Sequence, residues 1–203
     1  MTCSKTPDHG NWSQRPKSYP LSNYRFQSSE LLVLELLRFY CQSYADPASL
    51  AWEKAFALGE KELGPYDGAW VVNATAAFIR TIRNERKASF EFIVSCCEIC
   101  RQQICVTELN SLWLIQAART ENTLVMETAG RLTLDRAGYW PGLEELLHKS
   151  RCLGSILNEV FPEEHVSLRH HSDQNRFARD ELSKGQFPKN QFPKTQFPEG
   201  KLH

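Results

Sequence analysis

Four of the seven cysteines in this chain lie close together, and they are the residues that most clearly point to chemistry. Cys96, Cys97, Cys100 and Cys105 fall within the stretch CCEICRQQIC. Thiolates are soft metal ligands and good nucleophiles. Several cysteines at such short spacing therefore indicate a metal site, a redox pair or a group of packed core residues.

The metal hypothesis starts from the C-x-x-C pair of Cys97 and Cys100. This spacing allows two thiolates to bind one tetrahedral zinc ion, and Cys96 and Cys105 supply further ligands if the loop folds back. A complete zinc knuckle would add a second C-x-x-C or an H-x-x-x-H, but the nearest downstream candidates are His148 and Cys152, on another predicted helix. The spacing thus predicts zinc as the cofactor, held by the four listed cysteines, and no other cofactor.

Two other interpretations of these cysteines remain open. Free cysteines often pack as small apolar core residues, and this needs no ligand. Alternatively, Cys97 or Cys100 is the reactive thiol of a redox sensor or enzyme, with the positive charge of Arg101 lowering the thiol pKa. A thioredoxin-like site would also need a βαβ context, which the sequence does not show.

Length and charge exclude several classes of function. The chain has 203 residues and is 41% hydrophobic, which is enough to bury the core of one domain. Basic and acidic side chains balance at 24 each, and the middle of the chain is slightly acidic. A nucleic-acid partner is therefore disfavoured, although Arg80, Arg83, Arg86 and Lys87 lie near one predicted helix end. Neither a nucleophile elbow nor a nucleotide-binding glycine loop occurs, so we expect a protein without enzymatic activity.

The sequence also predicts a cytoplasmic protein that does not contact a membrane. The N-terminus lacks the apolar core of a signal peptide. The longest apolar stretch, residues 31–37, is interrupted by Glu35 and is far shorter than the roughly 20 residues that cross a bilayer. Cytoplasmic thiols stay reduced, and an odd number of cysteines does not fit a closed set of disulfides.

Hydrophobic spacing predicts one compact all-α domain, residues 28–161, with about six helices. Ser28 or Ser29 is the expected cap of the first helix, and Gly64 with Pro65 ends the second. Residues 88–106 fit either a strand or a helix, and we favour a helix because no partner strand is evident. In the helix after Thr120, the residues expected to face the core are Leu124, Val125, Ala129 and Leu132. Six predicted helices cover residues 28–44, 47–63, 66–87, 107–119, 120–134 and 140–161, and residues 88–106 would add a further one.

Both ends of the chain are predicted to be disordered. Residues 1–27 are rich in Ser, Pro, Asn and basic side chains, and little in them offsets the entropy of ordering. Within residues 162–203, charged side chains and histidines make up more than half of residues 163–184, and three low-complexity repeats follow that begin at Gln186, Gln191 and Gln196 with Gln-Phe-Pro. Proline at every fifth position excludes a helix, and one phenylalanine per repeat cannot form a core.

Residues 28–161 resemble a group of short bacterial proteins of unknown function. Those proteins are all-helical and carry a cysteine-bearing loop just before a helix that opens with an acidic capping turn. The cysteines ahead of Thr107 and Glu108 match that pattern here. The resemblance implies a helical fold and a small regulatory or accessory role, and it carries no activity.

These observations lead to one main functional hypothesis and one alternative. We expect a non-enzymatic binding or regulatory protein whose cysteine loop is pinned by zinc. The sequence does not identify the partner, and a protein partner is an expectation that no motif in the chain carries. The alternative is a thiol-based redox sensor or enzyme that uses Cys97 or Cys100.

Overall fold

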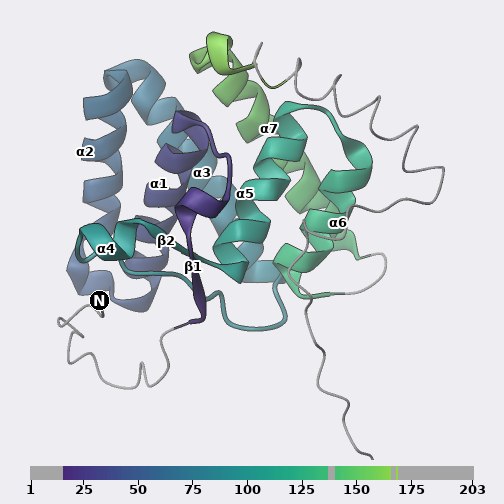
Figure 1. The fold of residues 1–203 in the computed structure, drawn as a ribbon, viewed down its shortest axis with the longest axis horizontal. Helices are drawn as coiled ribbons and strands as arrows, with labels where there is room; N and C mark the ends of the chain where they lie inside the picture. Colours follow the sequence, from purple (N-terminus) through teal and green to yellow (C-terminus); the bar gives the residue numbers. More distant parts are fainter. Residues whose placement is uncertain (1–15, 137–139, 166–167, 169–203) are drawn as a thin grey trace, which may run out of the picture. The chain divides into compact units, whose positions relative to one another are not determined.

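The structure is a computed structural model that describes residues 16–136, 140–165 and 168 (Figure 1). Of these residues 76% are helical, and they form six helices of seven residues or more and one two-stranded sheet, so the all-α prediction is confirmed. The helices are α1 (Ser28–Ala45), α2 (Ala51–Leu63), α3 (Pro65–Glu85), α4 (Glu98–Arg101), α5 (Val106–Arg119), α6 (Thr123–Leu134) and α7 (Pro141–Val160). The strands are β1 (Ser18–Pro20) and β2 (Gln103–Cys105), and two short 3-10 helices are η1 (Leu21–Asn23) and η2 (Pro47–Ser49).

Internal contacts divide the chain into one compact unit up to Val166 and a second from Ser167 to His203. Of the second unit the structure describes residue 168 alone. The predicted disorder of residues 1–15 and of the Gln-Phe-Pro repeats therefore concerns residues outside the described part of the chain.

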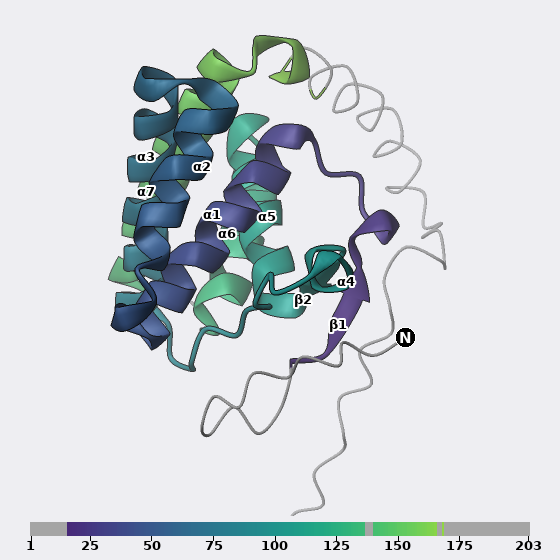
Figure 2. The ribbon, with the colours of Figure 1, turned by 90° about the vertical axis from the view of Figure 1, so that its left-hand side faces the viewer.

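The helices of the first unit enclose one large hydrophobic core. α5 packs against α6 and α7, α3 packs against α2 and α7, and α1 contacts α2, α3 and α5. In Figure 2, α2, α3 and α7 lie on one side of α1 and α5, and β1, β2 and α4 lie on the other side. Burial of apolar side chains is the main favourable term in this packing. The core includes Val33, Leu34, Leu37, Phe78, Ile82, Leu112, Ile115, Leu146, Leu153 and Leu157.

The ordered domain begins earlier than the sequence predicts. β1 pairs with β2 in antiparallel orientation, with Tyr19 opposite Ile104. Leu21, Tyr24 and Phe26 then pack against the core. Scattered aromatic residues in a polar segment can thus be ordered when the backbone gains a strand partner and the rings gain an apolar surface.

The prediction of a helix over residues 88–106 was wrong. After α3 the chain runs without regular structure until the single turn of α4, and β2 follows directly. The partner strand that the sequence did not reveal is β1, which lies far away along the chain. Backbone groups of the loop find partners outside it, as when the Ile93 N–H donates to the Glu108 side chain, so the loop needs no helix to satisfy them.

The core-facing side of α6 also differs from the prediction. Of the four residues expected to face the core, Ala129 is buried as predicted. Leu124, Val125 and Leu132 are instead 69%, 40% and 51% exposed, and Met126 is buried. Small residues on the buried side let α6 approach α7, because a Cβ added to Gly130 would lie 2.8 Å from Leu143 Cδ1. Because α6 carries apolar residues on two sides, hydrophobicity alone does not show which side faces the core. Close packing against α7 decides it.

A buried ion pair joins the start of α1 to the end of α5. The Nη1 atom of Arg119 lies 2.6 Å from Glu30 Oε1, and both side chains are fully buried. Burial raises the pKa of Glu30, although the charge of Arg119 opposes this effect. Glu164 lies 3.3 Å from Arg119 and also accepts a hydrogen bond from Ser29. The domain therefore extends beyond residue 161, where the sequence analysis placed its end.

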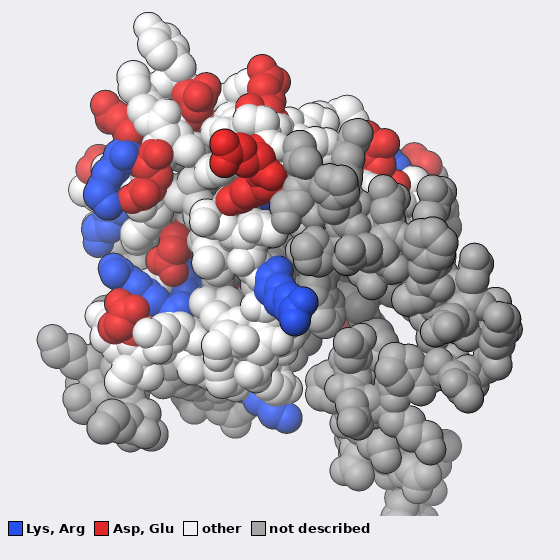
Figure 3. All heavy atoms as spheres, turned by 45° about the horizontal axis from the view of Figure 1, so that its top comes forward, with Lys and Arg blue, Asp and Glu red and all other residues white. Residues whose placement is uncertain are grey.

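Charges are mixed on the face of the molecule shown in Figure 3. Acidic and basic side chains lie near one another over the part of this face that is not grey. Among the described residues, no helix combines the length and the apolar character needed to cross a membrane.

The crossing of α2 and α3 gives a test of the packing. A Cβ on Gly68 would overlap the backbone of Gly59 and Glu60, which cannot move aside without shifting α2. We expect Gly68→Ala to lower the free energy of unfolding by about 3 kcal/mol, as overpacking does, in urea denaturation. The control is Gly130→Ala, whose new methyl group meets the flexible ends of the Leu143 and Leu147 side chains. This variant also gains about 1 kcal/mol from the higher helix propensity of alanine. Equal losses for the two variants would contradict the proposed close approach.

Candidate metal centre

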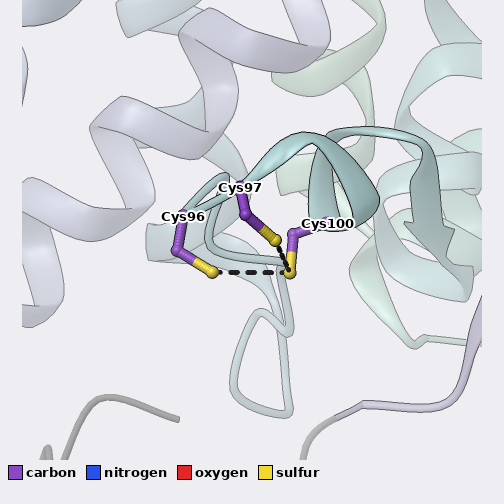
Figure 4. Close-up of side chains that lie close together, drawn as sticks. All are labelled: Cys96, Cys97 and Cys100. Carbon is purple, nitrogen blue, oxygen red and sulfur yellow. Dashed lines mark hydrogen bonds between the residues drawn. The ribbon is translucent and has the colours of Figure 1, made fainter. Parts of the chain in front are cut away.

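Three of the four cysteines in the loop come together in the structure. The sulfur of Cys100 lies 3.4 Å from that of Cys96 and 3.6 Å from that of Cys97. All three sulfurs lie within 4.8 Å of one another. Figure 4 shows them pointing toward a common point, with Cys96 and Cys97 in the segment before α4 and Cys100 on α4 itself. Three thiol ligands are thus within the reach of a single metal ion.

Local backbone geometry explains this convergence. Cys97 is the N-cap residue of α4 and has extended backbone angles, φ −157° and ψ 170°. The single turn of α4 brings Cys100 back beside Cys97, because residues three apart are neighbours on a helix. The turn is closed by the Arg101 N–H, which donates to the Cys97 carbonyl oxygen at 3.1 Å. The C-x-x-C spacing therefore brings the sulfurs of Cys97 and Cys100 together, 3.6 Å apart.

The three cysteines differ in their access to solvent. Cys96 is exposed, Cys97 is half-buried and Cys100 is buried. Cys100 packs with Ile93 and Cys105 in a small apolar cluster apart from the main core. An ion held by these sulfurs would therefore rest on apolar side chains and remain open toward the side of Cys96.

Cys105, the fourth predicted ligand, is not part of the group of sulfurs. Its thiol is completely buried and donates a hydrogen bond to the Glu91 carbonyl oxygen at 3.3 Å. Burial raises its pKa from 9.0 to about 12, and the neighbouring charge of Glu108 adds to this increase. Cys105 is instead the N-cap residue of α5, and it packs beside Cys100 without joining the group of three converging sulfurs.

The carboxylate of Glu108 holds the cysteine loop against the helices. It accepts hydrogen bonds from the Ile93 N–H at 3.0 Å and from the Cys105 N–H at 2.9 Å. The second bond is half of a capping box at the start of α5. Glu108 thus anchors both the beginning of the loop and its end, while its own side chain is fully buried.

Arg38 on α1 neutralises this buried carboxylate. Its Nε atom lies 2.8 Å from Glu108 Oε1, and its Nη2 atom donates to the Gln103 carbonyl oxygen at 2.5 Å. Its Nη1 atom lies 3.0 Å from Glu35 and donates to Ser95 Oγ at 3.2 Å. Burial by itself would lower the pKa of Arg38, but the bond and charge of Glu108, with those of Glu35, outweigh burial and raise it.

Sequence reasoning missed the roles of Arg38 and Glu108. Glu108 was recognised as an acidic residue in the first turn of a helix, but its contact with the loop was not predicted. The available signal was Arg38 itself, a lone basic residue within an apolar helix. A charge in such a place is rarely buried unless it is paired.

A mostly apolar cleft of about 440 Å³ lies beside α4. One wall is formed by the segment that follows β1, including Tyr24 and Phe26, whose rings stack 5.9 Å apart. Glu98 and Arg101 of α4 also line the cleft. The short helix α4 therefore carries a thiol ligand and also lines the cleft.

No family model matches the chain, and comparisons with the curated proteins and with the solved structures find no similar protein. The resemblance to short bacterial proteins stays a prediction, and the functional argument rests on the geometry of the site.

The buried pair predicts a large effect of charge removal. Glu108→Gln leaves Arg38 without its main partner and weakens the hydrogen bonds that hold the loop, so we expect a loss of about 3–5 kcal/mol in chemical denaturation. Hydrogen exchange of the Ile93 and Cys105 amides should accelerate in conditions where the variant is still folded. The control, Glu62→Gln, removes an exposed pair with Lys61 and should change stability by less than about 1 kcal/mol. Similar losses in both variants would rule out the anchoring role.

The raised thiol pKa of Cys105 predicts a loss of stability at alkaline pH. A group whose pKa is higher in the folded state stabilises the fold below its unfolded pKa, and this contribution disappears as the pH rises from 9 toward 12. In Cys105→Ala the free energy of unfolding should therefore fall less steeply with rising pH, by up to about 1.4 kcal/mol per pH unit. Chemical denaturation from pH 8 to pH 11 measures this slope. Val33→Ala, a buried control without a thiol, should lower stability without changing the slope.

Proposed function

We propose that the chain is a non-enzymatic binding or regulatory protein whose cysteine loop is pinned by one zinc ion. Cys96, Cys97 and Cys100 are the proposed ligands, and Cys105 is not one of them. The observation that carries the proposal is the convergence of three thiol sulfurs from one short segment. Thiolates are preferred zinc ligands, and they must be deprotonated to bind.

The sulfur spacing fits tetrahedral coordination of zinc. Tetrahedral coordination with zinc–sulfur bonds of about 2.3 Å separates the sulfurs by about 3.8 Å. The separations of 3.4 and 3.6 Å are close to this value. Small rotations of the Cys96 and Cys97 side chains would adjust them, and these two residues are the less buried members of the group.

The role proposed for the metal is structural, with water or a group of a partner as the fourth ligand beside the three thiolates. Zinc would fix α4 and the turn before it, and α4 contributes Glu98 and Arg101 to the neighbouring cleft. The shape of one cleft wall would then depend on metal occupancy. A protein partner, as the sequence analysis predicts, would contact a surface that zinc keeps in one conformation.

The alternative is a redox function of the same thiols. The contact between Cys96 and Cys100 at 3.4 Å supports it, because oxidation of two neighbouring thiols would join them in a disulfide. The two functions make opposite predictions for the purified protein. A zinc site retains metal and protects its thiols, whereas a redox pair is metal-free and changes mass on mild oxidation.

Metal content is the direct test of zinc binding. Protein purified without a metal-affinity tag should contain close to one zinc per chain by elemental analysis. The Cys152→Ser background is used because Cys152 is an exposed thiol outside the loop. Chelation should lower the melting temperature, because binding to the native state alone stabilises it by about 2.7 kcal/mol at a hundredfold excess over the dissociation constant. Replacing Cys97 and Cys100 together by Ser should abolish binding.

Two matched variants define the ligand set. Cys105→Ala and Cys41→Ala each remove a buried thiol and should lower stability while leaving the metal content unchanged. Loss of zinc in Cys105→Ala alone would show that Cys105 is a ligand after all. A metal-free wild-type protein whose stability does not respond to chelation would refute zinc binding, and an oxidation-induced disulfide would then favour the redox function.

A further inference from the structure

A second pair of metal-ligating side chains lies on α7, apart from the cysteine loop. His148 and Cys152 are four residues apart, so they occupy neighbouring positions on one face of the helix. Both are exposed, and the His148 Nε2 atom lies 3.7 Å from the Cys152 Sγ atom. Neither side chain contributes to the hydrophobic core.

The separation of the two atoms matches that of ligands on one metal ion. Zinc lies about 2.3 Å from a thiolate sulfur and about 2.0–2.1 Å from an imidazole nitrogen, so the two atoms stand about 3.6 Å apart in a tetrahedral site. The observed 3.7 Å needs no rearrangement of the helix. Since both ligands lie on one helix, metal binding fixes their side chains without ordering any additional backbone.

The surrounding charges set the strength of this site. Arg151 is exposed beside Cys152 and opposes a bound cation. Lys149 has less effect because its Nζ atom lies 3.1 Å from Glu145. Glu144 is exposed one turn before His148, in the row that continues to Cys152. A carboxylate in that position adds negative potential and can orient an imidazole ligand.

This site would have an open coordination sphere. Among the described residues, the group in the cysteine loop is the only set of three or more potential ligands that converge. His148 and Cys152 therefore supply two ligands, and water or an external ligand completes the coordination. The pair supplies one protein ligand fewer than the cysteine loop, and its open coordination positions allow the metal to exchange and to accept further ligands.

We propose that His148 and Cys152 chelate one borderline transition-metal ion, with zinc as the reference metal, independently of the cysteine loop. Imidazole and thiolate together suit such ions better than magnesium or calcium, which prefer oxygen ligands. The proposal goes beyond the structural zinc of the loop, because it assigns a second, exchangeable site on a different helix.

Protection of Cys152 from alkylation tests the proposal directly. The full-length protein is treated with N-ethylmaleimide with and without added zinc chloride, and the modified Cys152 peptide is quantified by mass spectrometry. At saturating zinc we expect alkylation of Cys152 to slow by about tenfold or more, because a metal-bound thiolate is a poor nucleophile toward the reagent. Addition of EDTA should restore the original rate.

A pair of variants identifies the second ligand. His148→Gln should abolish the protection by zinc, whereas Glu145→Gln should retain it, since Glu145 pairs with Lys149. An unchanged rate in zinc, or equal protection in His148→Gln, would overturn the proposal. Both results can be read from the Cys152 peptide alone, so they do not depend on the metal content of the cysteine loop. The experiment is repeated with Cys96, Cys97 and Cys100 replaced by Ser. Zinc protection of Cys152 that persists there belongs to the α7 site, whatever the cysteine loop binds.

Discussion

The carboxylate of Glu108 is a buried negative charge at the point where α1, α5 and the cysteine loop meet. It caps α5 through the Cys105 N–H, holds the loop through the Ile93 N–H and pairs with Arg38. An unpaired charge in this place would cost several kcal/mol, so the three contacts depend on one another. The start of α5, the path of the loop and the orientation of α1 are therefore coupled through one side chain.

A second buried ion pair, Glu30 with Arg119, favours one relative orientation of α1 and α5. α1 contributes Glu30 and Arg38, and α5 contributes Arg119 and Glu108, so each helix supplies one charge of each sign. Reversing one helix against the other would place like charges together inside the protein, at a large cost in free energy. Buried pairs add little net stability compared with apolar residues of similar size, but this pattern favours one orientation of the two helices. The position of the cysteine loop therefore depends on this orientation of α1 and α5.

Local patterns were enough to predict most of the helices and the core of the candidate site. Apolar residues at a period of 3.6 predicted α1, α3, α5 and α7, because helix periodicity depends on neighbouring residues alone. The convergence of Cys97 and Cys100 follows from the same geometry, since a C-x-x-C pair needs one turn of chain. The proline and glycine at the start of α3 marked the boundary between α2 and α3 correctly.

The amino-acid sequence by itself determined the all-α class, the main helix positions and the pairing of the close-spaced thiols. Only the tertiary structure decided the path of the loop and the ordered conformation of residues 16–27. It also decided that the Cys105 sulfur does not join the other three. Each of these depends on a contact between distant parts of the chain: Glu108 with Ile93 and Arg38, and β1 with β2. Such contacts leave no local period in the sequence, because the partners meet only after the helices have packed.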